Sequence, residues 1–109
     1  MAYDSAFAPF GPTYLVGTSA VQVKSSNNVY PSGYRIINLT GSLIRVGWQP
    51  QEPSDVTVTP SASSPTAAGV ANVLTLPANA VGVFSGIPPN AWFIASAASV
   101  EITPGEGIS

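Results

Sequence analysis

Short runs of alternating hydrophobic and polar residues, separated by clusters of proline, glycine, serine and asparagine, extend over almost the whole chain. A period of two places the apolar side chains on one face of a strand. Frequent turn residues between such runs are typical of a sandwich or barrel. The pattern gives about eight or nine strands, and no window of about 12 residues has helical apolar spacing. It therefore predicts an all-β, single-domain β-sandwich.

The clearest predicted strand covers residues 43–48, where Ile44, Val46 and Trp48 share one face and Arg45 lies on the other. A Thr-Gly-Ser turn at residues 40–42 precedes it. Residues 34–39 lie just before that turn, so we expect them to form a hairpin with residues 43–48.

Proline and glycine positions divide the rest of the chain. Further strands are predicted at residues 56–59, 73–76, 81–85, 92–96 and 99–103, with breaks at Pro60, Pro77, the turn at 88–90 and Pro104. Residues 60–72 are small and polar, which indicates a long exposed loop. The predicted organisation is an extended N-terminal arm at 1–12, a β-sandwich domain at 13–103 and a C-terminal tail at 104–109.

The chain has three basic and five acidic residues in 109, no histidine and no cysteine. Most catalysis at neutral pH uses a titrating base, an activated nucleophile or a metal cluster, and nearly all the residues for these tasks are missing. Such low charge also makes repulsion between copies weak. The composition therefore favours a non-enzymatic protein that binds other protein, with no cofactor and no metal.

The acidic pair Glu52 and Asp55 is the one candidate for carboxylate chemistry, because glycosidases place two carboxylates on either side of a sugar. Its proline-rich turn is more typical of solvated loop acids, and calcium needs a denser cluster of oxygens. Asn38 begins an Asn-Leu-Thr sequon, but the interpretation we prefer is that Asn38 helps to end a strand.

Scattered basic residues argue against nucleic acid as a partner, since nucleic-acid binders present clustered cations. The N-terminus lacks the pattern of an export signal, and no apolar run approaches the roughly 18 residues of a membrane span. We therefore expect no membrane association and synthesis in the cytoplasm.

Aromatic residues supply the candidate interface. Tyr3, Phe7 and Phe10 lie among prolines in the N-terminal arm, which is too aromatic for a tail that stays in water. Trp92 follows a Pro-Pro-Asn-Ala turn and is an interface candidate because tryptophan is enriched at binding hot spots. Trp48 is predicted to pack in the core. Tryptophan and tyrosine rings also leave open a sugar-binding platform.

Four short blocks carry a family resemblance: YRIIN at 34–38, LPANA at 76–80, PPNAWFIA at 88–95 and ITPGEG at 102–107. In these blocks the chain resembles the small jelly-roll cement, or decoration, proteins that coat the capsids of short-tailed bacteriophages. The resemblance implies a jelly roll of about eight strands that binds the major capsid protein as a homo-oligomer, a dimer or a trimer, on the virion surface. It carries no catalytic motif.

Two other functions stay open at this point. One is a β-sandwich carbohydrate- or receptor-binding module of a phage fibre or spike, with Trp92 as its platform. The other is a small hydrolase that uses Glu52 and Asp55.

Overall fold

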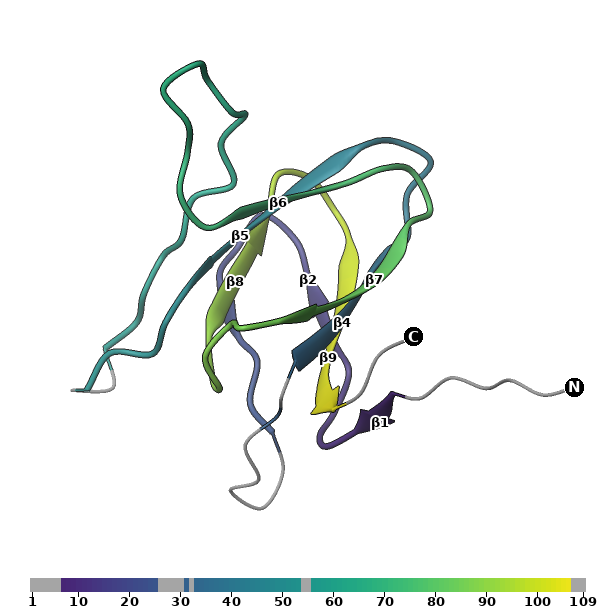
Figure 1. Ribbon diagram of the computed structural model, residues 1–109, viewed down its shortest axis with the longest axis vertical. Helices are drawn as coiled ribbons and strands as arrows, with labels where there is room; N and C mark the ends of the chain where they lie inside the picture. Colours follow the sequence, from purple (N-terminus) through teal and green to yellow (C-terminus); the bar gives the residue numbers. More distant parts are fainter. Residues whose placement is uncertain (1–6, 26–30, 32, 54–55, 107–109) are drawn as a thin grey trace, which may run out of the picture.

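The computed structural model describes residues 7–25, 31, 33–53 and 56–106. These residues form nine strands and no helix (Figure 1). The strands are β1 (Ala8–Pro9), β2 (Tyr14–Val16), β3 (Val21–Gln22), β4 (Gly33–Asn38), β5 (Ile44–Gln49), β6 (Val73–Leu76), β7 (Val81–Ser85), β8 (Trp92–Ala95) and β9 (Val100–Glu106). The predicted all-β fold is confirmed.

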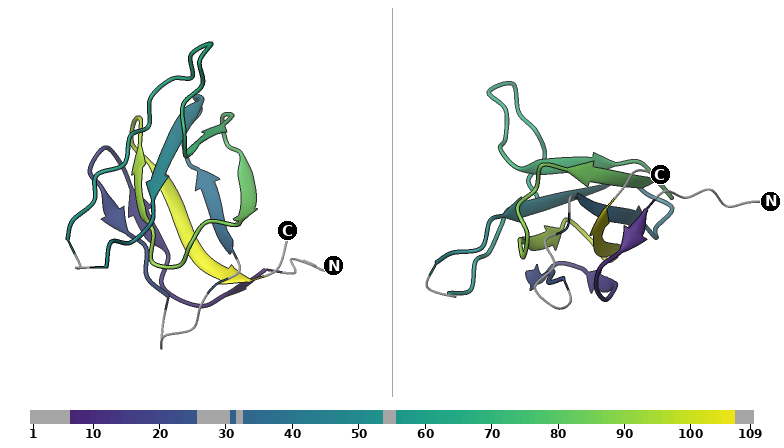
Figure 2. Two further views of the ribbon diagram at one scale, coloured as in Figure 1. Left: turned by 60° about the vertical axis from the view of Figure 1, so that its left-hand side comes forward. Right: turned by 60° about the horizontal axis from the view of Figure 1, so that its bottom comes forward.

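The strands make two antiparallel sheets that pack face to face (Figure 2). The five-stranded sheet has the order β1-β9-β4-β7, with β2 also paired to β9, and the four-stranded sheet has the order β3-β8-β5-β6. Taking β2 to β9 as strands one to eight, one sheet holds the first, eighth, third and sixth and the other the second, seventh, fourth and fifth. This is the strand order of a jelly roll.

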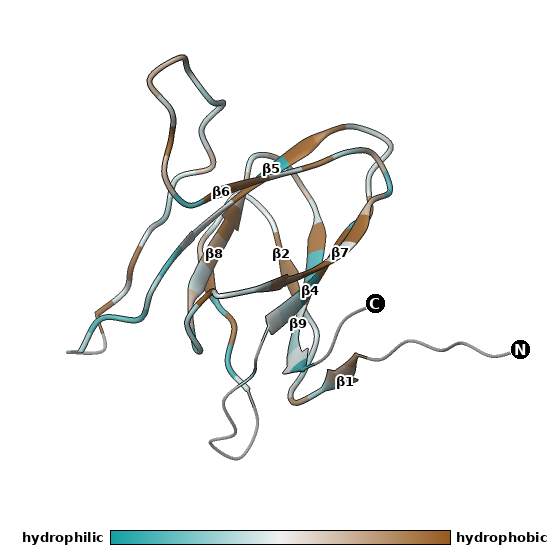
Figure 3. Cartoon of the chain, in the orientation of Figure 1, coloured by the Kyte–Doolittle hydropathy of each residue, from teal (hydrophilic) through white to brown (hydrophobic). Residues whose placement is uncertain are grey.

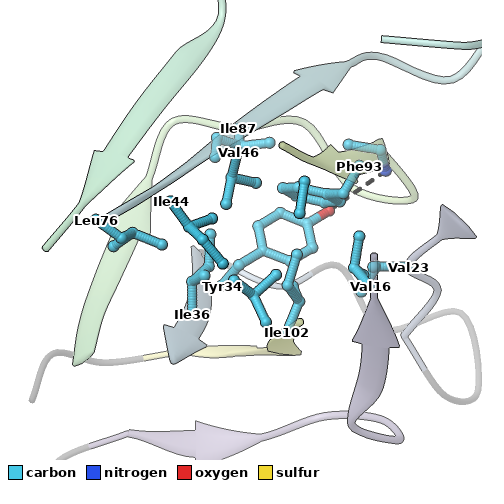
Figure 4. Packing of buried hydrophobic residues seen from close by; sticks show 13 residues of the cluster. Val16, Val23, Tyr34, Ile36, Ile44, Val46, Leu76, Ile87, Phe93 and Ile102 are labelled. Atoms are coloured by element: carbon cyan, nitrogen blue, oxygen red, sulfur yellow. Dashed lines mark hydrogen bonds between the residues drawn. The ribbon is translucent and has the colours of Figure 1, made fainter. Parts of the chain in front are cut away.

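Alternating side chains from both sheets fill the space between them (Figure 4). Tyr34 of β4 lies at the centre, fully buried, and its ring meets Phe93 of β8 edge to face with centroids 5.0 Å apart. The Tyr34 hydroxyl donates to the carbonyl of Pro88 at 2.6 Å, so its polar end is satisfied. Trp48, predicted to pack in the core, is half-buried and packs against the outside of this cluster.

The predicted hairpin of residues 34–39 and 43–48 is wrong. β4 pairs with β7 and β9, whereas β5 pairs with β6 and β8, so the two strands lie in opposite sheets. Asn38, the last residue of β4, explains the crossing. Its amide nitrogen donates to the carbonyls of Ser42, Leu76 and Pro77, which ties the turn to the end of β6 instead of letting it close a hairpin.

The connection between β5 and β6 is longer than predicted. Residues 56–59 form no strand, so the whole segment 50–72 contains none in its described part, and it projects from the sandwich in Figure 1. The segment still touches the domain, because Pro60 is buried and a Cβ added at Gly47 would collide with the carbonyl oxygen of Ser61. The outer surface of β5 is therefore covered at Gly47 by its own loop.

The described residues nearest each chain end belong to the five-stranded sheet, which the sequence did not indicate. The strand break predicted at Pro104 is wrong, since β9 continues to Glu106, and residues 104–106 belong to the sheet and not to a C-terminal tail. Of the predicted N-terminal arm, residues 1–6 lie outside the described residues. Residues 8–9 form β1, which pairs with Gly105 and Glu106 of β9.

Candidate interaction surface

The outer face of the five-stranded sheet carries large apolar side chains. Register places Leu15, Glu101, Ile37 and Val81 in one row across β2, β9, β4 and β7. Leu15 is 64% exposed and Val81 is 56% exposed, and Ile37 between them is half-buried. Figure 3 shows hydrophobic segments on β2 and β7, where the two exposed residues lie.

Two opposite charges accompany this row. Arg35 lies two residues before Ile37 on the same face of β4, opposite Thr103, which places it diagonally from Glu101 on β9. Within the described residues neither side chain forms an ion pair, and the Nε atom of Arg35 is buried without a hydrogen-bond partner. We call the surface formed by Leu15, Arg35, Ile37, Val81 and Glu101 the Ile37 face.

Residues 7–10 border the Ile37 face. The Phe7 side chain is only 7% exposed and lies against Gly105, where an added Cβ would collide with the Phe7 ring and with the carbonyl of Ala8. The Arg35 guanidinium lies over the Phe7 ring, 5.1 Å from its centroid, in a cation–π contact. The Phe10 amide donates to the Pro104 carbonyl at 2.8 Å. This segment is therefore held on β9 by main-chain hydrogen bonds and by the buried Phe7 ring.

The structure describes three of the four predicted interface residues. Phe7 is buried against the domain and reaches a partner only if its segment leaves β9, whereas Phe10 is half-buried at the surface. Tyr3 lies outside the described residues. Trp92 is half-buried on β8 of the four-stranded sheet, whereas β1 belongs to the five-stranded sheet. The structure thus brings Phe7 and Phe10 together and leaves Trp92 apart from them.

Amide side chains surround Trp92. Gln22 of β3 and Gln49 of β5 are its register partners on either side. The Gln22 amide nitrogen donates to the backbone carbonyl of Asn90 at 3.0 Å, and the Asn90 amide contacts the Gln51 oxygen at 3.5 Å. A half-buried indole between amides offers one apolar surface with polar groups at its edge.

The remaining candidate residues are placed as follows. Glu52 is exposed, and Asp55 lies outside the described residues. Within the described part of the chain, no three histidine, cysteine or carboxylate residues lie close enough to hold a metal ion. Asn38 of the sequon is 1% exposed and ends β4, as predicted. Its amide nitrogen is engaged by three backbone carbonyls, which leaves no room for a glycan.

Leu15, Ile37 and Val81 were not predicted as site residues. Alternation was the available signal, since Leu15 lies between the inward-facing Tyr14 and Val16, and Ile37 between Ile36 and Asn38. Each of these three side chains therefore had to face away from the core. What the sequence did not reveal is that their strands belong to one sheet, in which β9 lies between β2 and β4 and β7 lies next to β4.

Comparison with known proteins gives no relative: no family model matches the chain, and neither a curated protein nor a solved structure is similar to it. Among the residues that the structure describes, no helix is long and apolar enough to cross a membrane.

Proposed function

We propose that the chain is a non-enzymatic structural protein of a bacteriophage virion, which binds the outside of the capsid and stabilises it by bridging neighbouring major capsid protein subunits. The observation that carries this proposal is the combination of a charge-poor jelly roll with exposed apolar side chains beside an aromatic segment that lies on the edge of its sheet. Contiguous exposed apolar residues mark protein-binding surfaces. The resemblance of four sequence blocks to cement proteins points to the same role.

The N-terminal segment is suited to a bridging contact. Within the described residues β1 pairs with β9 at Ala8 and Pro9, which places this segment at the edge of the sheet, where a partner strand can add or exchange main-chain hydrogen bonds. Apolar surface buried between the chain and two capsid subunits stabilises their contact by roughly 25 cal/mol per Å². Weak contacts repeated over a symmetric shell add up through multivalency.

The direct test is cryo-electron microscopy of particles that carry the chain, together with rebinding of the purified protein to shells from which it has been removed. We expect regular density that bridges capsomers, and shells that withstand heating better after rebinding. Tyr3→Ala with Phe10→Ala is expected to weaken rebinding, whereas Val70→Ala, an exposed apolar change in the β5–β6 connection, serves as the matched control. Shells that never bind the protein would contradict the proposal.

A carbohydrate- or receptor-binding module of a phage fibre or spike is the second candidate, because Trp92 lies between Gln22 and Gln49. Flat indole rings pack on the apolar faces of sugars, and amides bond their hydroxyls. Glycan-array binding that Trp92→Ala abolishes and Val81→Ala, on the other sheet, preserves would favour this function over capsid binding.

A further inference from the structure

We propose that the Ile37 face binds a second copy of this chain, so that two copies pair through the outer faces of their five-stranded sheets. The inference rests on the proposed virion role, in which the protein acts as a small oligomer, but its test requires only the isolated chain. It commits to one occupant because the apolar and charged groups of the face complement each other.

The apolar side chains of the Ile37 face are exposed to water. Leu15 and Val81 are more than half exposed, and Ile37 lies between them in the same cross-strand row. This row spans three strand spacings, or about 14 Å. A water-exposed row of this kind is stabilised when another apolar surface excludes the water.

The charged part of the face indicates what covers it. Arg35 and Glu101 carry opposite charges, lie diagonally across β4 and β9, and have no ion-pair partner in the described chain. In a two-fold symmetric contact, residue i of one copy meets residue j of the other and the reverse contact follows. A face with one unpaired cation and one unpaired anion is therefore complementary to itself.

The positions of the side chains fit such an axis. Consider a two-fold axis that lies in the plane of contact, passes midway between Arg35 and Glu101 at right angles to the line that joins them, and so runs close to Ile37. It brings Arg35 opposite Glu101 of the second copy and Glu101 opposite Arg35 of the second copy. Ile37 lies close to the axis and meets its own counterpart. The apolar residue therefore takes the centre and the ion pairs flank it, which is the usual arrangement of an interface with an apolar core and a polar rim.

The size of the face sets the expected strength. Four strands about 4.8 Å apart and a β9 of seven residues give a flat area of roughly 300–400 Å² per copy. Stable interfaces bury about 800 Å² per partner, so the area buried by this pair is less than that of a stable interface. We therefore expect a weak pair, with a dissociation constant of roughly 100 μM, which falls inside the range of concentrations that sedimentation equilibrium reaches.

The experiment is a charge exchange between copies. Arg35→Glu alone and Glu101→Arg alone each place like charges opposite each other twice, and we expect each variant to associate about tenfold more weakly than the wild type. Mixing the two variants one to one sets opposite charges against each other again at both contacts, so association is expected to return. Lys24→Glu and Glu52→Arg are the matched controls, because both positions are exposed elsewhere and undergo the same changes of charge.

The outcomes separate this inference from the proposed function. Weakening by each single change and recovery in the mixture support the pairing, provided that both variants keep the cooperative unfolding of the wild type. A wild-type chain that stays monomeric up to about 1 mM overturns it, as does an oligomer that neither charge change weakens. In both cases the rebinding test still decides whether the chain binds the capsid. If the wild-type chain is monomeric and Ile37→Lys abolishes its binding to shells, the Ile37 face contacts the capsid and not a second copy.

Discussion

Replacing Asn38 by alanine is expected to be among the most destabilising single changes in this protein. The side chain is almost fully buried where β4 leaves one sheet and the chain crosses to β5 in the other. Its amide nitrogen contacts the carbonyls of Ser42, Leu76 and Pro77 at 2.8, 3.2 and 2.9 Å. Its oxygen accepts the backbone N–H and the hydroxyl of Thr40 at 2.9 and 2.8 Å. Alanine removes all of these contacts.

The magnitude follows from what an amide can satisfy. Two N–H hydrogens and two oxygen lone pairs support about four hydrogen bonds, each contributing about 1 kcal/mol net. Ser42 and Thr40 lie near solvent and recover part of the loss through water, whereas the Leu76 carbonyl is buried. We therefore expect Asn38→Ala to lower the free energy of unfolding by about 3 kcal/mol, out of the roughly 5–15 kcal/mol of a typical domain.

Urea denaturation followed by tryptophan fluorescence measures this directly. With a slope of about 1–1.5 kcal/mol per molar urea, the midpoint of Asn38→Ala should fall by roughly 2 M or more. Ser42→Ala is the matched control, because the turn uses the backbone carbonyl of Ser42 and the side chain is exposed. If Asn38→Ala stays within about 1 kcal/mol of the wild type, the amide does not hold the two sheets together and the explanation of the crossing fails.

Three further changes test other contacts. Burial raises the pKa of Tyr34 above its ordinary value of 10.0, so above pH 10 the unfolded tyrosine ionises while the native one stays protonated. The stability that Tyr34 contributes is therefore complete below pH 10 and falls as the pH rises further. The stability difference between wild type and Tyr34→Phe should therefore shrink above pH 10 in urea titrations. Gly105→Ala should displace Phe7 and expose the N-terminal segment to protease, with a loss of about 1–3 kcal/mol; resistance equal to the wild type would refute that contact. Gly47→Ala should push Ser61 off β5 and accelerate subtilisin cleavage within residues 56–72, and unchanged cleavage would show that the connection is not held there.

Hydrophobic alternation predicted most strands but not their partners. The strands at β5, β6, β7 and β8 agree with the sequence patterns to within a residue or so, because one side of each faces the core. Alternation says which face of a strand is buried and nothing about which strand lies beside it. A short turn at residues 40–42 fits a hairpin and a crossing between sheets equally well. The decision depends on Asn38 and carbonyls almost forty residues later in the chain.

Phe7 illustrates the same limit for single residues. An aromatic side chain among prolines near a terminus is typical of a partner-binding arm, which is why Phe7 was predicted to contact a partner. In the fold, β9 places a glycine at position 105, and the absence of a Cβ there leaves space for the Phe7 ring. No local pattern connects residues 7 and 105, so the burial of this ring was not predictable from the sequence.

The Ile37 face, like the burial of Phe7, depends on contacts between strands that no local sequence pattern reveals. Leu15, Ile37 and Val81 each face outward by alternation, and a scattered exposed aliphatic residue is ordinary on a protein surface. Only the jelly-roll order, which inserts β9 between β2 and β4, sets them in one row with Glu101 among them. In a chain with so few charges, a cation and an anion that form no ion pair within the described residues lie beside an apolar row, and the proposed symmetric pairing accounts for both. The topology thus decides which of the few charged residues of this chain lie beside an exposed apolar surface.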